Sequence, residues 1–472
     1  MKTIRHFLIT VILVIVSSVT ASSQSAFPIK VSSNQRYLVD QHDMPFPVLG
    51  RTAWCIISLP VNGYRKFISN TKLHGHNAIE ISSICHWPLG NHPPYNGEGD
   101  LPFLKKLDGS DWTGSLIYKD TSKEAPDFNT PNEKYWRYMD SFISYCDSNG
   151  ILIFFFPAYV GYEGGDQGWM QELLANGPQK VQTYGAWIAQ RYKNNRNLVW
   201  MLLGDMGKFS TEQKNVEAAL ITGLKSIHNQ QCIHYSAESY AGQNSADQID
   251  FGDQMTLNGA YTWGTINVPY MGNLAYSHKP LLPSYLLEEP YDEEGPDGNH
   301  YNPHSIQPVR RFQWWGWLTT RGGYISGNGY IWPFIDPAWE KHLNTIGALD
   351  MSRLNSFIRS IRWWELVPSN QDGMKNLVHA GGSTDTAADY VAAAATEDGS
   401  FLVAYVPPAH RGSISIDMSA LKMPVHGSWY DPTNGKYIKI YGSPFKHKGI
   451  REFNPPGKNS AGEDDWVLVL RK

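Results

Sequence analysis

The sequence predicts an α/β fold, in which a (β/α)8 TIM barrel is followed by a small C-terminal antiparallel β-sandwich. Eight short apolar segments with strand character recur before about residue 380, and most of the connections between them carry helical periodicity. Beyond that point the helical patterns stop, and short strands separated by turn residues follow one another. We therefore expect a barrel over residues 27–380 and a β-sandwich over residues 385–472.

The predicted barrel strands come in sequence with room for a helix between most of them. They are residues 46–54, 77–84, 151–156, 198–203, 232–236, 255–258, 280–287 and 323–326. The third strand is apolar throughout, as expected of a parallel strand covered on both faces. An open doubly wound sheet is the alternative, but no Gly-rich dinucleotide fingerprint follows a strand, so the closed barrel is favoured.

Two helix starts have clear local signals. Thr130-Pro-Asn-Glu133 combines a capping box with Pro at the first helical position, and Ser210 with Gln213 repeats the capping signal. The segment from Cys85 to Thr130 is long and rich in Gly, Pro, Asp and Trp. Because it follows the second strand, we expect it on the C-terminal rim of the barrel, where barrel enzymes place their sites.

The C-terminal strands are predicted at residues 390–395, 401–406, 413–417, 427–430 and 466–471. Turn residues separate them, as in Asp431-Pro-Thr-Asn-Gly435, which is the pattern of an antiparallel β-sandwich.

The N-terminus predicts a targeting segment. Lys2 and Arg5 precede an apolar run from Phe7 to Val16, and small polar residues follow. This is the pattern of a secretory signal peptide, and the run is short for a membrane span. We expect a signal peptide at residues 1–24, a secreted or periplasmic protein, and no membrane insertion after cleavage.

Composition and charge narrow the class of partner. The net charge of -4 is small for 472 residues, which argues against a polyanionic partner such as a nucleic acid. Seventeen Trp and 26 Tyr exceed what a core of this size needs. Flat aromatic side chains stack on the apolar faces of sugar rings, so the excess favours a carbohydrate ligand.

The sequence predicts neither a metal nor a cofactor. The four Cys lie in or beside apolar segments without a C-x-x-C spacing, and no H-E-x-x-H motif is present. They resemble buried hydrophobic residues, and an oxidising compartment would permit one disulfide, although the sequence does not pair them. The positions are Cys55, Cys85, Cys146 and Cys232.

Paired carboxylates indicate glycoside hydrolysis. That reaction needs one carboxyl group to protonate the leaving oxygen and a second to attack the anomeric carbon or activate water. Asp205 follows the fourth predicted strand, and Glu288-Glu289 follows the seventh. Alternate strand residues face opposite sides, so only one of the two glutamates can face the site, and we favour Glu289 because Pro290 follows it directly.

Several longer motifs resemble the apiosidase-like family, glycoside hydrolase family 140 and its relatives. The match spans nearly all of the chain after residue 30. The motifs are Leu49-Gly-Arg-Thr-Ala-Trp54, Asn197-Leu-Val-Trp-Met-Leu-Leu-Gly-Asp205, Lys279-Pro280, Glu289-Pro-Tyr291, Arg310-Arg311 with Trp314-Trp315, Gly327-Asn-Gly329, Ala404-Tyr405 and Trp429-Tyr-Asp-Pro432.

The resemblance implies that Asp205 is the acid/base and Glu289 the nucleophile of a retaining barrel glycosidase. The family includes enzymes that release apiose from pectin. The sequence departs from the family at Arg51, where the family usually has Asp. It also departs after Pro290, where the acidic residues are one position out of step with the family's Glu-Pro-x-Tyr-Glu motif.

The remaining candidate site residues lie at or near predicted strand ends. Those expected to bind substrate are Trp54, Glu80, His86, Trp87, Tyr159, Glu238, Asn258, Tyr261, Tyr291 and Asn328. Glu80 lies inside an apolar run, so it needs a partner, and we expect Arg51. Glu238 is the rival catalytic carboxylate. The structural alternatives are a loop-capping role for Asp205 and a solvated acidic loop for Glu288–Glu294.

Together these patterns predict a secreted glycoside hydrolase acting on a plant-type polysaccharide or glycoside by a retaining two-carboxylate mechanism, with the apiosidase-like specificity that the resemblance implies. A non-catalytic carbohydrate-binding barrel is the alternative. An esterase is disfavoured because no G-x-S-x-G motif is present.

Overall fold

The computed structural model describes residues 26–85, 94–114, 124–227, 233–236, 243–262, 268–288, 291–293, 307–334 and 336–472. A small antiparallel sheet of β1 (Lys30–Val31), β2 (Leu38–Val39) and β3 (Pro45–Phe46) leads into the barrel.

Eight parallel strands follow in barrel order. They are β4 (Val48–Thr52), β5 (Ala78–Ser82), β6 (Leu152–Phe156), β7 (Leu198–Leu203), β8 (Ile233–Ser236), β9 (Asn258–Ala260), β10 (Ser284–Leu286) and β12 (Arg321–Asn328). Each strand pairs with the next from β4 to β8, β9 pairs with β10, β10 with β12, and β12 returns to β4. In the part of the chain that is described, no ladder joins β8 to β9. The (β/α)8 prediction is confirmed, with β11 (Tyr291–Asp292) added beside β12.

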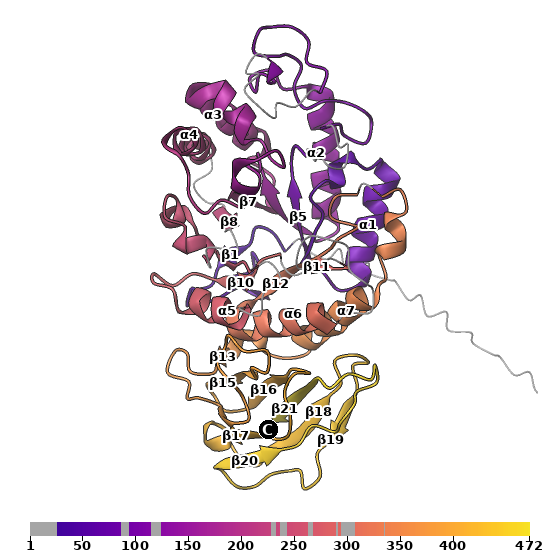
Figure 1. Ribbon diagram of the computed structural model, residues 1–472, viewed down its shortest axis with the longest axis vertical. Helices are drawn as coiled ribbons and strands as arrows, with labels where there is room; N and C mark the ends of the chain where they lie inside the picture. Colours follow the sequence, from indigo (N-terminus) through magenta and orange to yellow (C-terminus); the bar gives the residue numbers. More distant parts are fainter. Residues whose placement is uncertain are drawn as a thin grey trace, which may run out of the picture.

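Helices cover the outside of the sheet (Figure 1). They are α1 (Val61–Leu73), α2 (Glu133–Ser148), α3 (Met170–Tyr192), α4 (Thr211–Ile227), α5 (Val268–Ser277), α6 (Gln307–Thr320) and α7 (Ile346–Arg359). None of the helices in the described residues is long and apolar enough to span a membrane.

Alternation along the strands separates the barrel interior from the helix-facing layer. In β6, Leu152, Phe154 and Phe156 belong to the interior cluster, while Ile153 and Phe155 pack toward the helices. All five are fully buried, which explains why the sequence of this strand is apolar without a polar face.

The two predicted helix starts differ in outcome. Before α4, the Ser210 amide donates to Gln213 Oε1 at 2.8 Å and the Gln213 amide to Ser210 Oγ at 3.2 Å, so this capping box is confirmed. The start of α2 was predicted two residues too early. Asn132 caps that helix, and Thr130 instead accepts a hydrogen bond from the Lys105 amide in the preceding loop.

The C-terminal part consists of two antiparallel sheets, as predicted. The first has six strands in the order β13 (Leu366–Pro368), β15 (Ala392–Thr396), β16 (Phe401–Val406), β21 (Trp466–Arg471), β18 (His426–Tyr430) and β19 (Tyr437–Lys439). The second has three, in the order β14 (Val378–Ala380), β17 (Ile414–Asp417) and β20 (Ile450–Phe453). The sheets thus begin at Leu366, ahead of the composition change near residue 380.

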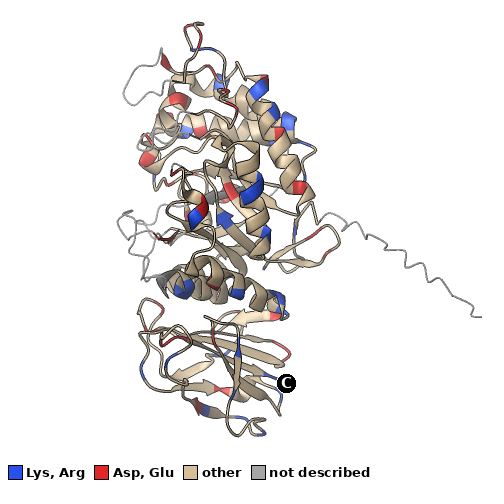
Figure 2. Ribbon diagram, turned by 90° about the vertical axis from the view of Figure 1, so that its right-hand side faces the viewer, with Lys and Arg blue, Asp and Glu red and all other residues tan. Residues whose placement is uncertain are grey.

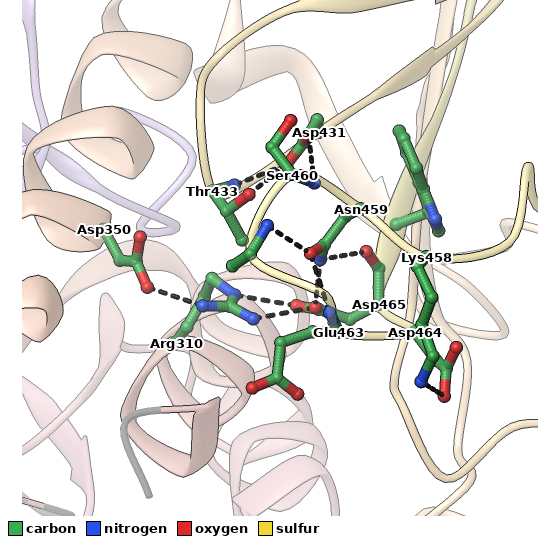
Figure 3. Close-up of polar contacts among 12 residues, drawn as sticks. Arg310, Asp350, Asp431, Thr433, Lys458, Asn459, Ser460, Glu463, Asp464 and Asp465 are labelled. Atoms are coloured by element: carbon green, nitrogen blue, oxygen red, sulfur yellow. Dashed lines mark hydrogen bonds and ion pairs between the residues drawn. The ribbon is translucent and has the colours of Figure 1, made fainter. Parts of the chain in front are cut away.

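A buried ionic network joins this β-domain to the barrel. Figure 3 shows Arg310 of α6 between two carboxylates, Asp350 of α7 and Asp465 just before β21. Its Nη1 lies 2.6 Å from Asp350, and its Nε and Nη2 lie 2.8 and 2.7 Å from the two oxygens of Asp465. Trp314 stacks on Tyr405 beside it, with 5.8 Å between ring centroids. The two parts therefore share one packed interface.

Candidate active site

The ends of β7 and β10 bend sharply where the candidate acids lie. Leu203 has φ of 64° and Glu288 has φ of 66°, values that non-glycine residues rarely adopt. The Leu203 amide donates to Glu217 Oε1 of α4 at 3.1 Å, and its carbonyl accepts from Val160. Such strain persists only where surrounding contacts hold it, and it concentrates at functional sites.

Asp205 lies just after this bend and is half-buried. Its Oδ2 accepts hydrogen bonds from the hydroxyls of Tyr159 at 3.1 Å and Tyr261 at 3.3 Å. Burial, and then the charge of Asp205, raises the pKa of Tyr159 well above its ordinary value. Tyr159 is therefore a neutral hydrogen-bond donor that holds the Asp205 carboxyl at the mouth of the barrel.

Glu288 is buried at the end of the seventh barrel strand, with 4% of its surface exposed. Its Oε1 accepts a hydrogen bond from Trp54 Nε1 at 2.6 Å and another from the Tyr291 hydroxyl. The Trp54 ring packs against Tyr159, with centroids 4.8 Å apart, so the surroundings of Glu288 and Asp205 are continuous. Two donors on one oxygen stabilise a negative charge on Glu288.

Glu80 lies on the inner face of β5 and has no exposed surface. Neither of its carboxyl oxygens has a hydrogen-bond partner among the described residues. Burial raises the pKa of Glu80 well above its ordinary value, and the negative charges of Glu288 and Asp205 raise it further. The three carboxyl groups therefore belong to one site, in which burial and the neighbouring negative charges disfavour the charged form of Glu80.

The predicted pair between Glu80 and Arg51 does not form. Arg51 is opposite Ile79 in the ladder, whereas Glu80 is opposite Thr52, so the two side chains leave opposite faces of the sheet. The Arg51 guanidinium donates to Asn70 Oδ1 at 2.8 Å and lies over the ring of Phe67 on the helix side.

Four of the predicted binding residues gather around the carboxylates, namely Trp54, Tyr159, Tyr261 and Tyr291. Asn328 lies at the end of β12, but its amide donates to Asp292 and Glu293 at 3.3 and 2.9 Å. Asn258 begins β9 rather than ending it, and its Oδ1 accepts from the Ala246 amide at 3.0 Å. Both amides are thus occupied by protein groups.

The other predicted site residues lie outside the described residues. They are His86, Trp87, Glu238 and Glu289.

Two features of the site were missed by sequence reasoning. Glu217 is fully buried on α4, and burial raises its pKa to about 8. Its spacing from Leu220 and Leu224 places it on the apolar face of the helix, a signal that was available. A disulfide joins Cys55 to Cys85, with Cα atoms 5.3 Å apart, and links the loops after β4 and β5 beside Trp54.

No group of three or more His, Cys, Asp or Glu within the described ranges is arranged to hold a metal ion.

Comparison with known families gives two matches. Residues 32–365 match the family model described as "Apiosidase-like, catalytic domain". Residues 376–471 match a model described as "Putative collagen-binding domain of a collagenase". No curated protein matches the sequence.

Solved structures with the same fold span both parts of the chain. One described as a glycoside hydrolase has a TM-score of 0.73 at 19% identity, covering 95% of this chain and 99% of its own. A glycoside hydrolase family 5 protein from Bacteroides vulgatus has a TM-score of 0.72 at 20% identity, covering 95% of each chain. At such identities the likeness concerns the fold.

Proposed function

The chain belongs to the apiosidase-like family, and on that premise we propose that it is an exported glycosidase that cleaves a plant-type polysaccharide or glycoside with retention of configuration. The observation that carries the mechanism is that two carboxyl groups share one set of aromatic neighbours. The Tyr159 and Tyr261 hydroxyls donate to Asp205, Trp54 and Tyr291 donate to Glu288, and the Trp54 ring packs against Tyr159.

In the first step Glu288 attacks the anomeric carbon and forms a covalent bond to the sugar, while the bond to the leaving oxygen breaks. Asp205 gives its proton to that oxygen, so the aglycone departs as a neutral alcohol. In the second step Asp205 takes a proton from water, the water oxygen attacks the anomeric carbon, and Glu288 is released as a carboxylate.

Glu288 takes the nucleophile's role in this proposal because its carboxyl group is buried at the strand end and accepts hydrogen bonds from Trp54 and Tyr291. The sequence favoured Glu289, which stays a prediction. The bend at Glu288 turns the chain at this position, so the simple alternation used to choose between the two glutamates does not hold there.

The test of the function is a screen of purified protein against plant glycans and aryl glycosides, apiosides included. Hydrolysis is expected, and NMR of the first-formed product should show the anomer of the substrate. An inverted product would refute the double displacement. Sugar binding without hydrolysis would instead favour the carbohydrate-binding barrel.

Export is supported by two independent features. The basic start and apolar run of residues 1–24 have the pattern of a signal peptide. The Cys55–Cys85 disulfide is a bond that persists mainly in oxidising compartments. Mass spectrometry of protein recovered outside the cytoplasm should find a new N-terminus near residues 21–25, and recovery only of chains that retain Met1 in the cytoplasm would refute export.

A further inference from the structure

The β-domain carries a run of cations that the catalytic proposal does not use. We call it the basic band, defined as Lys436, Lys439, Lys446, Lys448 and Arg451. These residues lie within 16 positions of sequence that contain no Asp or Glu, in a chain whose net charge is -4. All five side chains are exposed. The band runs from β19 through the following loop into β20, at the end of the molecule away from the barrel (Figure 1).

The basic band is not neutralised by the protein. Among the described residues, none of its five cations forms an ion pair with a carboxylate, whereas Lys458 of the same domain lies 2.8 Å from Asp464. The guanidinium carbon of Arg451 lies over the Phe445 ring, 3.8 Å from its centroid. Glu452 follows Arg451 in the strand and points to the opposite face. Figure 2 colours the basic residues of this domain blue.

Exposed aromatic rings lie among these cations. Tyr441 is 99% exposed and Tyr437 is 43% exposed. The guanidinium of Arg471 lies 5.2 Å from the Tyr437 ring centroid, which adds a sixth cation next to the band. An exposed phenol ring offers a flat apolar face, and sugar rings stack on such faces. Cations alone would fit any polyanion, but cations interleaved with exposed tyrosine rings fit a charged sugar polymer best.

We propose that the basic band binds an anionic polysaccharide, one with carboxylate or sulfate groups on its sugars, and so holds the catalytic barrel near its substrate. This inference rests on membership in a glycosidase family, and it is independent of which glutamate is the nucleophile. It also revises the expectation drawn from net charge, because a small total can hide a local cluster whose field attracts a polyanion.

Binding is tested with the purified mature protein by affinity electrophoresis and calorimetry. The probes are polygalacturonate for carboxylate, dextran sulfate for sulfate and dextran as the neutral polymer. We expect binding to at least one of the charged polymers, weakened by added salt, and none to dextran. The charged polymer that binds identifies the group recognised. Failure of both charged polymers, or equal binding to dextran, would overturn the proposal.

The variant Lys446→Glu/Lys448→Glu should weaken polyanion binding on the order of tenfold. The matched control Lys193→Glu/Lys422→Glu makes the same change in net charge at exposed sites outside the band and should bind as the wild type does. Tyr441→Ala should weaken polysaccharide binding without changing charge. If the control variant loses as much polyanion binding as Lys446→Glu/Lys448→Glu does, the loss reflects net charge in general, and the proposal that the basic band binds the polymer is refuted.

Two further measurements distinguish polysaccharide binding from binding of other polyanions, and distinguish failure of this proposal from failure of the proposed glycosidase activity. Duplex DNA and vesicles containing phosphatidylglycerol serve as other polyanions, and tighter binding to either than to both charged polysaccharides would refute the assignment. Hydrolysis of a small aryl glycoside should be unchanged in the band variants. If that activity is absent from every variant and the wild type, the catalytic proposal fails while the binding result still stands.

Discussion

Two buried carboxylates of the barrel differ in what surrounds them at the scale of single residues. Glu288 accepts hydrogen bonds from Trp54 and Tyr291, whereas the described residues offer none to Glu80. Donors stabilise the charged form and burial alone favours the neutral form. One site therefore combines a carboxylate whose charge two donors stabilise with a buried carboxyl group whose surroundings favour its neutral form.

Replacing the proposed nucleophile is the sharpest test at this scale. Glu288→Gln should lower kcat on the order of a thousandfold or more, because the amide cannot form the glycosyl-enzyme bond. Folding and sugar binding should remain, as judged by circular dichroism and calorimetry. Glu289→Gln is the matched control. Activity that survives Glu288→Gln but not Glu289→Gln would restore the sequence-based choice of Glu289.

Asp205→Asn should separate the two steps of the reaction. Without its proton donor the enzyme should cleave natural glycosides very slowly, whereas aryl glycosides with good leaving groups need little protonation and should still form the covalent intermediate. A burst of released phenol followed by slow turnover is the expected kinetic signature. Equal loss on both substrate classes would argue that Asp205 positions the site and does not transfer a proton.

At the scale of elements, α4 and β7 meet through one buried carboxyl group. Glu217 of α4 accepts a hydrogen bond from the Leu203 amide at the bend that precedes Asp205, so the helix helps to set the direction of the loop that carries Asp205. Close approach of α4 to α3 depends on Gly223, since a Cβ there would lie 2.2 Å from the carbonyl oxygen of Gln182.

The raised pKa of buried Glu217 should lower the free energy of unfolding as the pH rises. Its folded-state pKa of about 8 exceeds the ordinary value of 4.5. Between these values the unfolded chain releases a proton that the folded chain keeps, so the free energy of unfolding falls with increasing pH. Glu217→Gln should flatten this dependence and add on the order of 3 kcal/mol at pH 8. Urea titrations between pH 5 and 8 measure the free energy of unfolding of the wild type and of this variant.

The control for this effect is Glu212→Gln, an exposed position on the same helix. It should leave the slope of stability against pH unchanged. A wild-type stability that does not fall between pH 5 and 8 would contradict the buried, protonated state of Glu217.

At the scale of the whole molecule, the barrel and the β-domain are joined across α6 and α7 by apolar and ionic contacts. Arg310, Asp350 and Asp465 are all at most 2% exposed. Buried charges of this kind depend on one another, since removing one partner leaves the other without compensation.

Arg310→Ala should therefore destabilise the protein by about 3–5 kcal/mol. Arg310→Lys keeps the charge but loses the two-pronged contact with Asp465, so it should cost less. Differential scanning calorimetry should show a single transition for the wild type, because the parts share an interface. Two separate wild-type transitions would show that the interface contributes little to cooperativity.

The sequence by itself determined the barrel and the two strand ends that carry the candidate acids. Apolar runs separated by helical periods report burial on both faces, and this information is local. Asp205 and the Glu288-Glu289 pair followed directly, because the ends of parallel strands meet at one rim. The capping box at Ser210 was equally local, and it was confirmed.

Only the tertiary structure decided which groups touch. The bend at Glu288, the separation of Glu80 from Arg51, the Cys55–Cys85 bond and the bridge from Arg310 to Asp465 each depend on residues that are distant in sequence or on a departure from regular strand geometry. Periodicity reports whether a residue is buried, but the partner of a buried polar group is chosen by the packing of separate elements, and that choice sets its charge.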